Sequence, residues 1–257
     1  PARLSADVLG TTPKHLIEEV LKLKPNQSAQ KEAFLMAIVS RSFDKSTIIF
    51  SKTKQEAHRL KIIMGLSDVK AGELHGDMTQ TQRLAALDDF RTGKVTHLIA
   101  TDVAARGLDI PAVDWIIQYD PPDDPKEYIH RVGRTARGTD GKGRALLFLI
   151  PEELAFLKYL KAAKVPLNEY EFPTKKIANV QSQLEKLVEK NYYLHTSARD
   201  AYRAYILAYN SHTLKDVYNV HSLDLNAVAS SFGFHKPPKV QLNLDSKASK
   251  ARTKSRG

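Results

Sequence analysis

The sequence predicts an α/β protein in which a parallel sheet is covered by helices on both faces. Short β-rich runs and amphipathic segments alternate repeatedly between residues 46 and 164, and short links join them. This order is typical of parallel sheets, whose crossover connections are right-handed in nearly all cases. Ligands of such proteins bind beyond the carboxyl ends of the strands, so residues at the end of a strand are candidates for a functional site.

The individual elements are predicted from apolar spacing and from start and stop signals. Residues 15–23 fit either a strand or a short helix, and strands are expected at 46–51, 71–76, 96–101, 113–119 and 144–150. Apolar residues recur at helical spacing, as at Ala33, Phe34, Ala37 and Ile38. Thr79 and Gly93 mark the start and stop of one helix, and Pro151 is the first residue of another. Helices are expected at 26–42, 53–66, 79–93, 126–137 and 151–164.

The character of the chain changes near residue 165, which predicts a boundary between a first region, 1–165, and the rest of the chain. Residues 166–176 read as an extended, proline-containing linker, and 177–238 as a helical extension. Its helices are expected at 177–191, 196–212 and 223–234, with Thr196 or Ser197 capping the second. The basic tail, 239–257, is expected to be disordered from residue 245 onward because it carries charge and little apolar content.

Two groups of residues in this extension have more than one interpretation. Tyr202, Tyr205 and Tyr209 lie on one face of the expected helix and could stack on nucleic-acid bases. A core stripe that packs the helix on its neighbours is the favoured interpretation. Three histidines lack companions at metal-ligand spacing, so no metal site is expected: His195, His212 and His221.

Composition narrows the class of partner. The chain has 257 residues, a net charge of +10 and a sequence pI of about 9.5. The excess of basic residues suggests a polyanionic partner, although a soluble protein with a charged surface could have the same net charge. Cysteine is absent, which excludes disulfides and thiolate metal sites, and no apolar run is long enough to span a membrane. The sequence does not begin with methionine, so we expect it to be part of a longer protein.

The stretch HRVGRTARG (130–138) gathers three arginines and a histidine. If the helix runs to residue 137, then His130, Arg134 and Arg137 share one face, and mutual repulsion there would be relieved by an anion. Guanidinium groups match phosphate oxygens, although a solvated basic face is the common alternative. The stretch ATDVAARGLDI (100–110) comes directly after an expected strand, and its Gly107 permits close approach of a ligand.

Together these two stretches resemble motifs V and VI of the DEAD-box RNA helicases. The stretch TIIFSKTKQEAHRL (47–60) resembles motif IV, and ELHGDMTQTQR (73–83) resembles motif IVa. The resemblance covers about residues 12–165 and implies the second of the two RecA-like domains of such a helicase. A weaker alternative is a DNA helicase of the same superfamily.

The resemblance implies a role for each matching residue. Arg134 and Arg137 resemble arginine fingers that reach the γ-phosphate of ATP, and His130 and Arg131 resemble residues that link the ATP site to the contacts between domains. Asp109 resembles a carboxylate near the ribose and the fingers, and the resemblance also implies that Arg131 is among the residues that contact ATP. The remaining matches resemble groups that bind RNA phosphates and sugars, contacts that position a strand without reading its sequence: Gly76, Gln82, Arg83, Thr101, Arg106 and Gly107.

The sequence lacks G-x-x-x-x-G-K-[ST] and lacks Asp-Glu-Ala-Asp. The resemblance therefore implies that ATP and Mg²⁺ are bound mainly by the N-terminal RecA-like domain of the same protein, outside this sequence. We expect this chain alone to hydrolyse no ATP.

The helical extension resembles the one shared by nucleolar DEAD-box helicases of large-ribosomal-subunit assembly. From about residue 109 the chain resembles one member of that group, and the earlier part resembles another. The resemblance implies pre-ribosomal RNA and pre-60S proteins as partners, and a location in the nucleus and nucleolus. The basic tail could bind RNA or act as a nuclear address. A second hypothesis is a docking module in which catalysis is dispensable.

Overall fold

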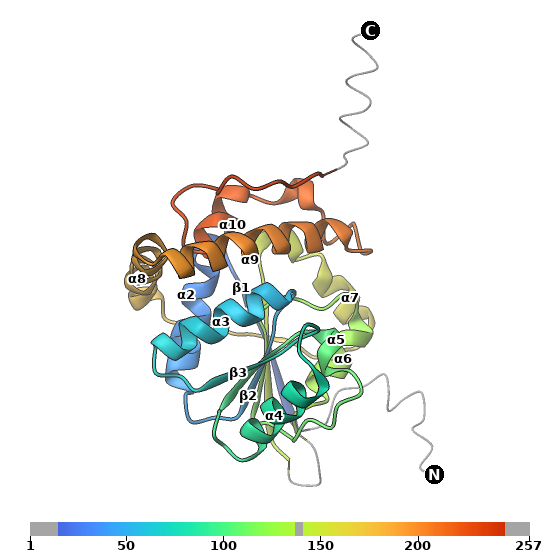
Figure 1. Cartoon of the computed structure of the whole chain (residues 1–257). Coiled ribbons are helices and arrows are strands. Elements are labelled where there is room, and N and C mark those ends of the chain that lie inside the picture. Colours follow the sequence, from blue (N-terminus) through green and yellow to red (C-terminus); the bar gives the residue numbers. More distant parts are fainter. Residues whose placement is uncertain (1–14, 137–140, 245–257) are drawn as a thin grey trace.

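The computed structural model describes residues 15–136 and 141–244, and its centre is a seven-stranded sheet in the order β3-β4-β2-β5-β6-β1-β7. All neighbouring strands in this sheet pair in parallel, as expected. Figure 1 shows the sheet beneath a layer of helices from the C-terminal part. The strands are β1 (Leu16–Lys22), β2 (Thr47–Phe50), β3 (Ala71–Leu74), β4 (His97–Ala100), β5 (Trp115–Gln118), β6 (Gly143–Leu149) and β7 (Asn168–Glu169).

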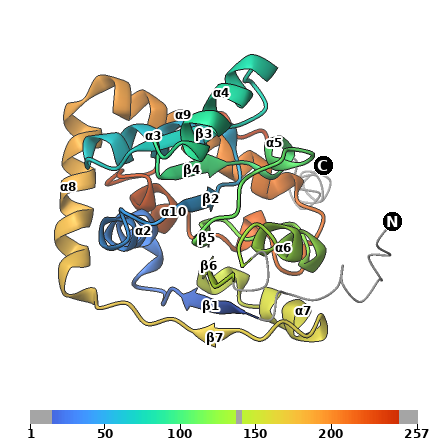
Figure 2. The ribbon, with the colours of Figure 1, turned by 90° about the horizontal axis from the view of Figure 1, so that it is seen from below.

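Helices cover both faces of the sheet. Seen from below, α2 and α8 lie on one side of the stacked strands, and α6 and α7 lie on the other (Figure 2). The α-helices are α2 (Lys31–Arg41), α3 (Lys54–Leu66), α4 (Gln80–Arg91), α5 (Asp102–Ala105), α6 (Pro125–Val132), α7 (Phe156–Ala162), α8 (Ile177–Lys190), α9 (Tyr192–Ser211) and α10 (Leu225–Ser231). Short 3₁₀ turns are η1 (Ser28–Gln30), η2 (Pro151–Glu153), η3 (Thr174–Lys176) and η4 (Val220–Ser222). The RecA-like architecture is therefore present in the described residues.

The central strands are buried on both faces, which explains their mainly apolar sequences. All four positions of β2, β4 and β5 are buried. A parallel sheet enclosed by helices needs such runs, because neither face meets water. His97 in β4 is a polar exception: burial lowers its pKa to about 4, so this imidazole is neutral.

The segment that fitted either a strand or a short helix is β1, and the expected linker adds a strand beside it. Residues 16–22 pair with 143–149 of β6, and Asn168 and Glu169 of β7 pair with the other edge of β1. Glu18 is buried in β1 and accepts a hydrogen bond of 3.0 Å from the Tyr128 hydroxyl of α6. The paired acidic residues obscured the strand pattern, since the partner of Glu18 is distant in sequence.

The C-terminal extension packs on the α2 and α3 side of the sheet and shares one apolar core with it. Helix α8 lies on α2, α9 lies on α3, and α10 contacts η1. The tyrosine stripe is core: Tyr202, Tyr205 and Tyr209 are 1%, 5% and 0% exposed. This arrangement confirms the favoured interpretation of the stripe.

Helix α9 begins earlier than the sequence predicted. Its N-cap is Asn191, whose side chain accepts a hydrogen bond of 3.0 Å from the backbone N–H of Leu194. The expected caps, Thr196 and Ser197, lie inside the helix, so that prediction is wrong. Asparagine is as effective a cap as serine, and the two exposed tyrosines directly after it gave no apolar pattern to reveal the start.

The first residues of the basic tail lie on the extension. Val240, Leu242 and Leu244 pack against the core, and Arg203 of α9 donates a 3.0 Å hydrogen bond to the carbonyl of Gln241. The disorder expected for 245–257 concerns residues outside those described. None of the helices in 15–136 and 141–244 combines the length and apolar content that a membrane crossing requires.

Candidate functional site

A pocket opens at the carboxyl edge of the sheet, where α5 comes after β4 and α6 comes after β5. It brings together residues from both stretches that the sequence singled out. Phe50 at the end of β2 forms part of the wall. The remaining lining residues are Asp102, Ala105, Arg106, Gly107, Glu127, His130, Arg131 and Arg134. Two segments that are separate in sequence therefore form one cationic site.

Arg131 is the buried anchor of this site. Its Nε and Nη2 each donate a hydrogen bond of 2.7 Å to the carboxylate of Asp102, and its Nη1 donates one of 2.7 Å to the carbonyl of Asp120. Burial opposes the charge, yet the attraction of Asp102 raises the pKa of the Arg131 guanidinium above its ordinary value. The residue is 2% exposed. These donors fasten α6 to α5, and the expected contact of Arg131 with the nucleotide stays a prediction.

Helix α6 ends before the second arginine, which corrects the shared helical face predicted for 130–137. The helix stops at Val132, with Gly133 at its C-cap. Thr135 then forms a parallel bridge with Val113 and donates its hydroxyl to the carbonyl of that residue. Ala136 comes next with φ of 52°, a left-handed conformation that cannot continue a helix. Pairing between distant segments thus overrides the helical pattern.

Arg134 instead lies across the loop after α5. Its Nη1 donates 3.2 Å to the carbonyl of Leu108, and its Nη2 donates 3.3 Å to the carbonyl of Ala105. The side chain is half-buried at the pocket wall. This brings Arg134 beside Gly107 and His130, while Arg137 falls outside the described residues.

The rim of the pocket is charged and more open. Arg106 donates 2.9 Å to Glu127, and its side chain remains 62% exposed. The imidazole Nδ1 of His130 lies 3.9 Å from the same carboxylate. Gly107 has φ of 73° and open space beside it, so a ligand could approach its backbone closely. Asp109 is exposed in the same loop.

The other predicted contacts cluster at the carboxyl ends of β3 and β4. Thr101 is the N-cap residue of α5, and its backbone N–H donates 3.1 Å to the carbonyl of Leu74 at the end of β3. Arg83 of α4 donates 3.2 Å to the carbonyl of Gly76. These interactions bring Gly76, Arg83 and Thr101 to one edge of the sheet.

Gln82 also caps helix α4, a structural role that its place in the motif did not reveal. Its side-chain oxygen accepts 2.8 Å from the backbone N–H of Thr79, while the Thr79 hydroxyl accepts 3.2 Å from the N–H of Gln82. This reciprocal capping box starts α4. The amide oxygen of Gln82 is occupied, which leaves its exposed amide nitrogen for another partner.

Two buried charge clusters beneath the extension were also missed. Lys31 donates 2.6 Å to Asp120, whose other oxygen accepts 2.8 Å from the backbone N–H of Lys52. Burial opposes the negative charge, but these two lysines hold the pKa of Asp120 below its usual range. Burial also lowers the pKa of Lys52, whose Nζ lies 5.1 Å from the Tyr218 ring.

The second cluster joins α2 to α3. Nη1 of Arg59 lies 2.7 Å from Glu32 and 3.5 Å from Glu56, and Nη2 donates 3.1 Å to the carbonyl of Phe232. Burial raises the pKa of Glu56 to about 8. The spacing of Glu56 and Arg59 on one helix was visible in the sequence, but their burial under α10 was not. Among the described residues, no group of three His, Cys, Asp or Glu side chains is arranged to hold a metal ion.

Comparison with known proteins defines the class of this chain. Residues 30–139 match the helicase conserved C-terminal domain, and residues 191–240 match the C-terminal extension of ATP-dependent rRNA helicases similar to SPB4. The chain therefore contains a helicase C-terminal domain and, after it, this extension, and the relatives that it matches are DEAD-box RNA helicases.

Particular relatives are similar over most of the chain. The probable ATP-dependent RNA helicase ddx18 of Dictyostelium discoideum is 58% identical over 219 residues, which is 85% of this chain and 36% of that protein. The ATP-dependent RNA helicase HAS1 of Saccharomyces cerevisiae is 53% identical over 229 residues, 89% of this chain and 45% of that protein. A single relative thus spans both parts that resembled different members, and the chain spans less than half the length of these relatives.

Solved structures agree with the fold. The Mss116p DEAD-box helicase domain 2 bound to an RNA duplex has a TM-score of 0.67 and 26% identity, with 85% of each chain covered. The C-terminal domain of the DEAD-box protein Dbp5 has a TM-score of 0.54 and 29% identity, covering 67% of this chain and 98% of that one. The greater coverage of this chain by Mss116p shows that the similarity to it extends beyond the part matched by Dbp5.

Proposed function

We propose that this chain supplies the second RecA-like domain of an ATP-dependent RNA helicase that remodels pre-ribosomal RNA during large-subunit assembly. The observation that carries the proposal is the pocket that joins Arg134 and His130 to the loop after β4. The relatives named above as ATP-dependent RNA helicases support the enzymatic class.

The chemistry of the pocket fits a phosphate better than a metal ion. Its two carboxylates, Asp102 and Glu127, are paired with Arg131 and Arg106. They therefore have little to offer Mg²⁺, which prefers free carboxylates, waters and phosphate oxygens. Arg134 and its neighbours at the rim can instead accept a terminal phosphate supplied by the opposite domain. In this proposal the N-terminal RecA-like domain of the same protein binds most of ATP and Mg²⁺.

In this proposal Arg134 and Arg137 act as arginine fingers, His130 links the ATP site to the contacts between domains, and Asp109 lies near the ribose. A positively charged finger stabilises charge on the transferred phosphoryl group and is worth about 10³–10⁵ in rate in phosphoryl-transfer enzymes. Arg131 holds α6 in place for this contact. A half-buried guanidinium with two carbonyl partners, like that of Arg134, is already held near its working position.

The RNA surface lies along the carboxyl ends of β3 and β4. The backbone N–H groups of Gly76 and Gly107, the hydroxyl of Thr101, and the side chains of Gln82, Arg83 and Arg106 provide donors for phosphates and 2′-hydroxyls. The similarity to a domain solved with an RNA duplex supports this surface. The helical extension supports a pre-60S particle as partner and a nucleolar location, since it matches the extension of an rRNA helicase family.

The test uses the full-length protein and its RNA-stimulated ATP turnover. We expect Arg134→Ala and Arg137→Ala each to abolish most turnover, with RNA affinity retained. The control is Arg144→Ala, which removes an exposed arginine of β6 that pairs with Glu19. If the finger variants lose turnover but still support ribosome assembly, the docking module is the better account. If turnover is unchanged in both, the arginine-finger assignment is wrong.

A further inference from the structure

The loop between β5 and α6, residues 119–124, is the covalent link that leads from the sheet into the arginine-bearing helix. It contains two prolines, and Asp124 caps α6 by accepting 2.8 Å from the backbone N–H of Glu127. Pro125 is the first helical residue. The position of this loop therefore sets where α6 begins and how it is directed.

The C-terminal extension contacts this loop through two buried side chains. The Tyr218 hydroxyl donates 2.7 Å to the carbonyl of Pro122, and Nε2 of His212 lies 2.8 Å from Oδ1 of Asp123. The rings of His212 and Tyr218 lie against each other in a tilted arrangement, with centroids 3.7 Å apart and an angle of 36° between their planes. Both side chains are buried, at 5% and 0% exposure. Two adjacent residues of the loop are thus fixed by one aromatic pair.

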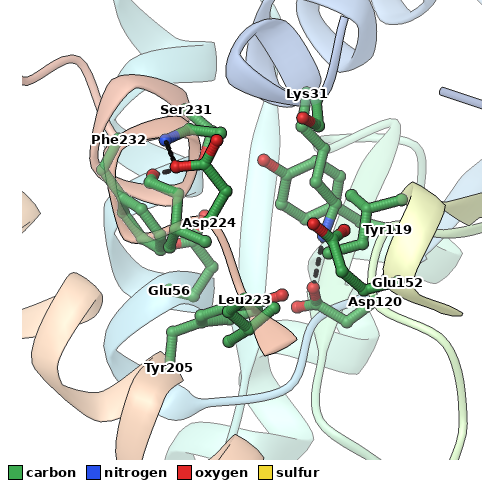
Figure 3. A pocket seen from close by; sticks show the side chains of 14 residues that line it. Lys31, Glu56, Tyr119, Asp120, Glu152, Tyr205, Leu223, Asp224, Ser231 and Phe232 are labelled. Carbon is green, nitrogen blue, oxygen red and sulfur yellow. Dashed lines mark hydrogen bonds and ion pairs between the residues drawn. The ribbon is translucent and has the colours of Figure 1, made fainter. Parts of the chain in front are cut away.

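The same loop also bonds to the sheet and to α2. Figure 3 shows Lys31 bonded to Asp120, with Tyr119 and Glu152 beside them and Leu223 and Asp224 of the extension opposite. The contact continues to the pocket, because Arg131 donates 2.7 Å to the carbonyl of Asp120. A continuous series of bonds therefore runs from the extension through this loop to α6.

We propose that His212 and Tyr218 are positioning residues for ATP turnover: through loop 119–124 they hold α6 so that Arg134 and His130 face the nucleotide. This inference rests on the proposed function. It assigns the extension a part in the ATP site, in addition to any part in docking. The aromatic pair touches neither pocket nor ligand, so its effect is on the rate of the chemical step, with RNA affinity unchanged.

The variant that isolates this contact is Tyr218→Phe, which keeps the ring and removes one hydroxyl. Its matched control is Tyr209→Phe, which also removes a buried hydroxyl from the extension, but one that contacts Glu153 at 3.3 Å and leaves loop 119–124 untouched. Asp123→Asn is a second variant for use if Tyr218→Phe does not fold. Asp123 has an exposed side chain, so this change preserves the core.

Two measurements are made on each variant. In the full-length protein, we expect Tyr218→Phe and Asp123→Asn to lower kcat for RNA-stimulated ATP turnover about three- to tenfold, with KM for RNA unchanged. In the chain of residues 1–257, amide hydrogen exchange over 125–134 should become faster by a similar factor. Tyr209→Phe should leave both quantities at the wild-type value.

The outcomes separate this inference from the proposed function. If the wild-type protein shows no RNA-stimulated turnover, the proposed function fails and the inference fails with it. If the wild type is active and Tyr218→Phe keeps the wild-type kcat, the inference is overturned while the proposed function stands. An equal loss of kcat in Tyr209→Phe would also overturn it, because the effect would then belong to the extension in general.

Discussion

We expect Arg131 to be essential for stability, in contrast to an exposed arginine such as Arg144. Changing Arg131→Ala removes hydrogen bonds to both oxygens of Asp102 and to the carbonyl of Asp120, from a side chain that is 2% exposed. It leaves a partly buried carboxylate without its partner. Breaking such a pair costs about 3–5 kcal/mol. For a domain of this size that loss corresponds to a fall in Tm of about 6–20 °C.

The assay is urea and thermal unfolding of residues 1–257, monitored by circular dichroism. The matched control is Arg144→Ala, since Arg144 donates to both oxygens of Glu19 at 3.2 and 3.0 Å but is 44% exposed. Its loss should cost about 1 kcal/mol or less. Adding Asp102→Ala to Arg131→Ala should restore part of the stability, because the stranded carboxylate is then gone. An Arg131→Ala protein no less stable than Arg144→Ala would refute the assignment of Arg131 as an anchor.

Three further changes test other parts of the structure. Burial raises the pKa of Glu153 from 4.5 to about 7, so between these pH values the carboxyl is protonated in the folded state and ionised in the unfolded state. The free energy of unfolding should therefore fall by up to about 3 kcal/mol as pH rises from about 4.5 to 7. Glu153→Gln should reduce the difference in stability between pH 5 and pH 8, measured by urea unfolding. Gly107→Ala meets no neighbour but must adopt φ of 73°, so a loss of about 1 kcal/mol is expected by thermal unfolding, and no loss would mean that the loop relaxes. Arg59→Met strands Glu32 and Glu56, so a loss of about 3–5 kcal/mol is expected at pH 8 and a smaller one at pH 5; equal losses at both values would contradict the account of that cluster.

The strands and most helices could be predicted because their signals are local. Both faces of β2, β4 and β5 are buried, and strands of that kind consist mainly of apolar residues, so the sequence alone reveals them. Thr79 and Gly93 marked the limits of α4 because capping is a matter of a few neighbouring residues. Such features depend little on tertiary context.

The features that were missed depend on partners far away in sequence. The end of α6 is set by the bridge between Thr135 and Val113, and the strand β7 exists because β1 offers an unpaired edge. Arg131 looked like a ligand-binding residue because its partner, Asp102, belongs to another element. A spacing argument cannot distinguish an arginine that binds a ligand from one that binds a buried carboxylate, since both need the same donors.

The burial of the tyrosine stripe is an intermediate case. Helical spacing indicated that Tyr202, Tyr205 and Tyr209 share a face, and the core interpretation was correct. Spacing did not reveal that Tyr218 and His212 of the extension would hold the loop that leads to α6. The extension is also part of the same core as the sheet.

The central claim is that Arg134 stabilises charge on the transferred phosphate, while Arg131 holds α6 in place. The most direct measurement is the single-turnover rate of ATP hydrolysis by the full-length Arg134→Ala protein, with ATP and RNA saturating and folding verified by its Tm. The account predicts a rate about 10³-fold or more below the wild type, with Tm lowered far less than in Arg131→Ala. A rate within about tenfold of the wild type, in a folded protein that binds ATP and RNA, would contradict it.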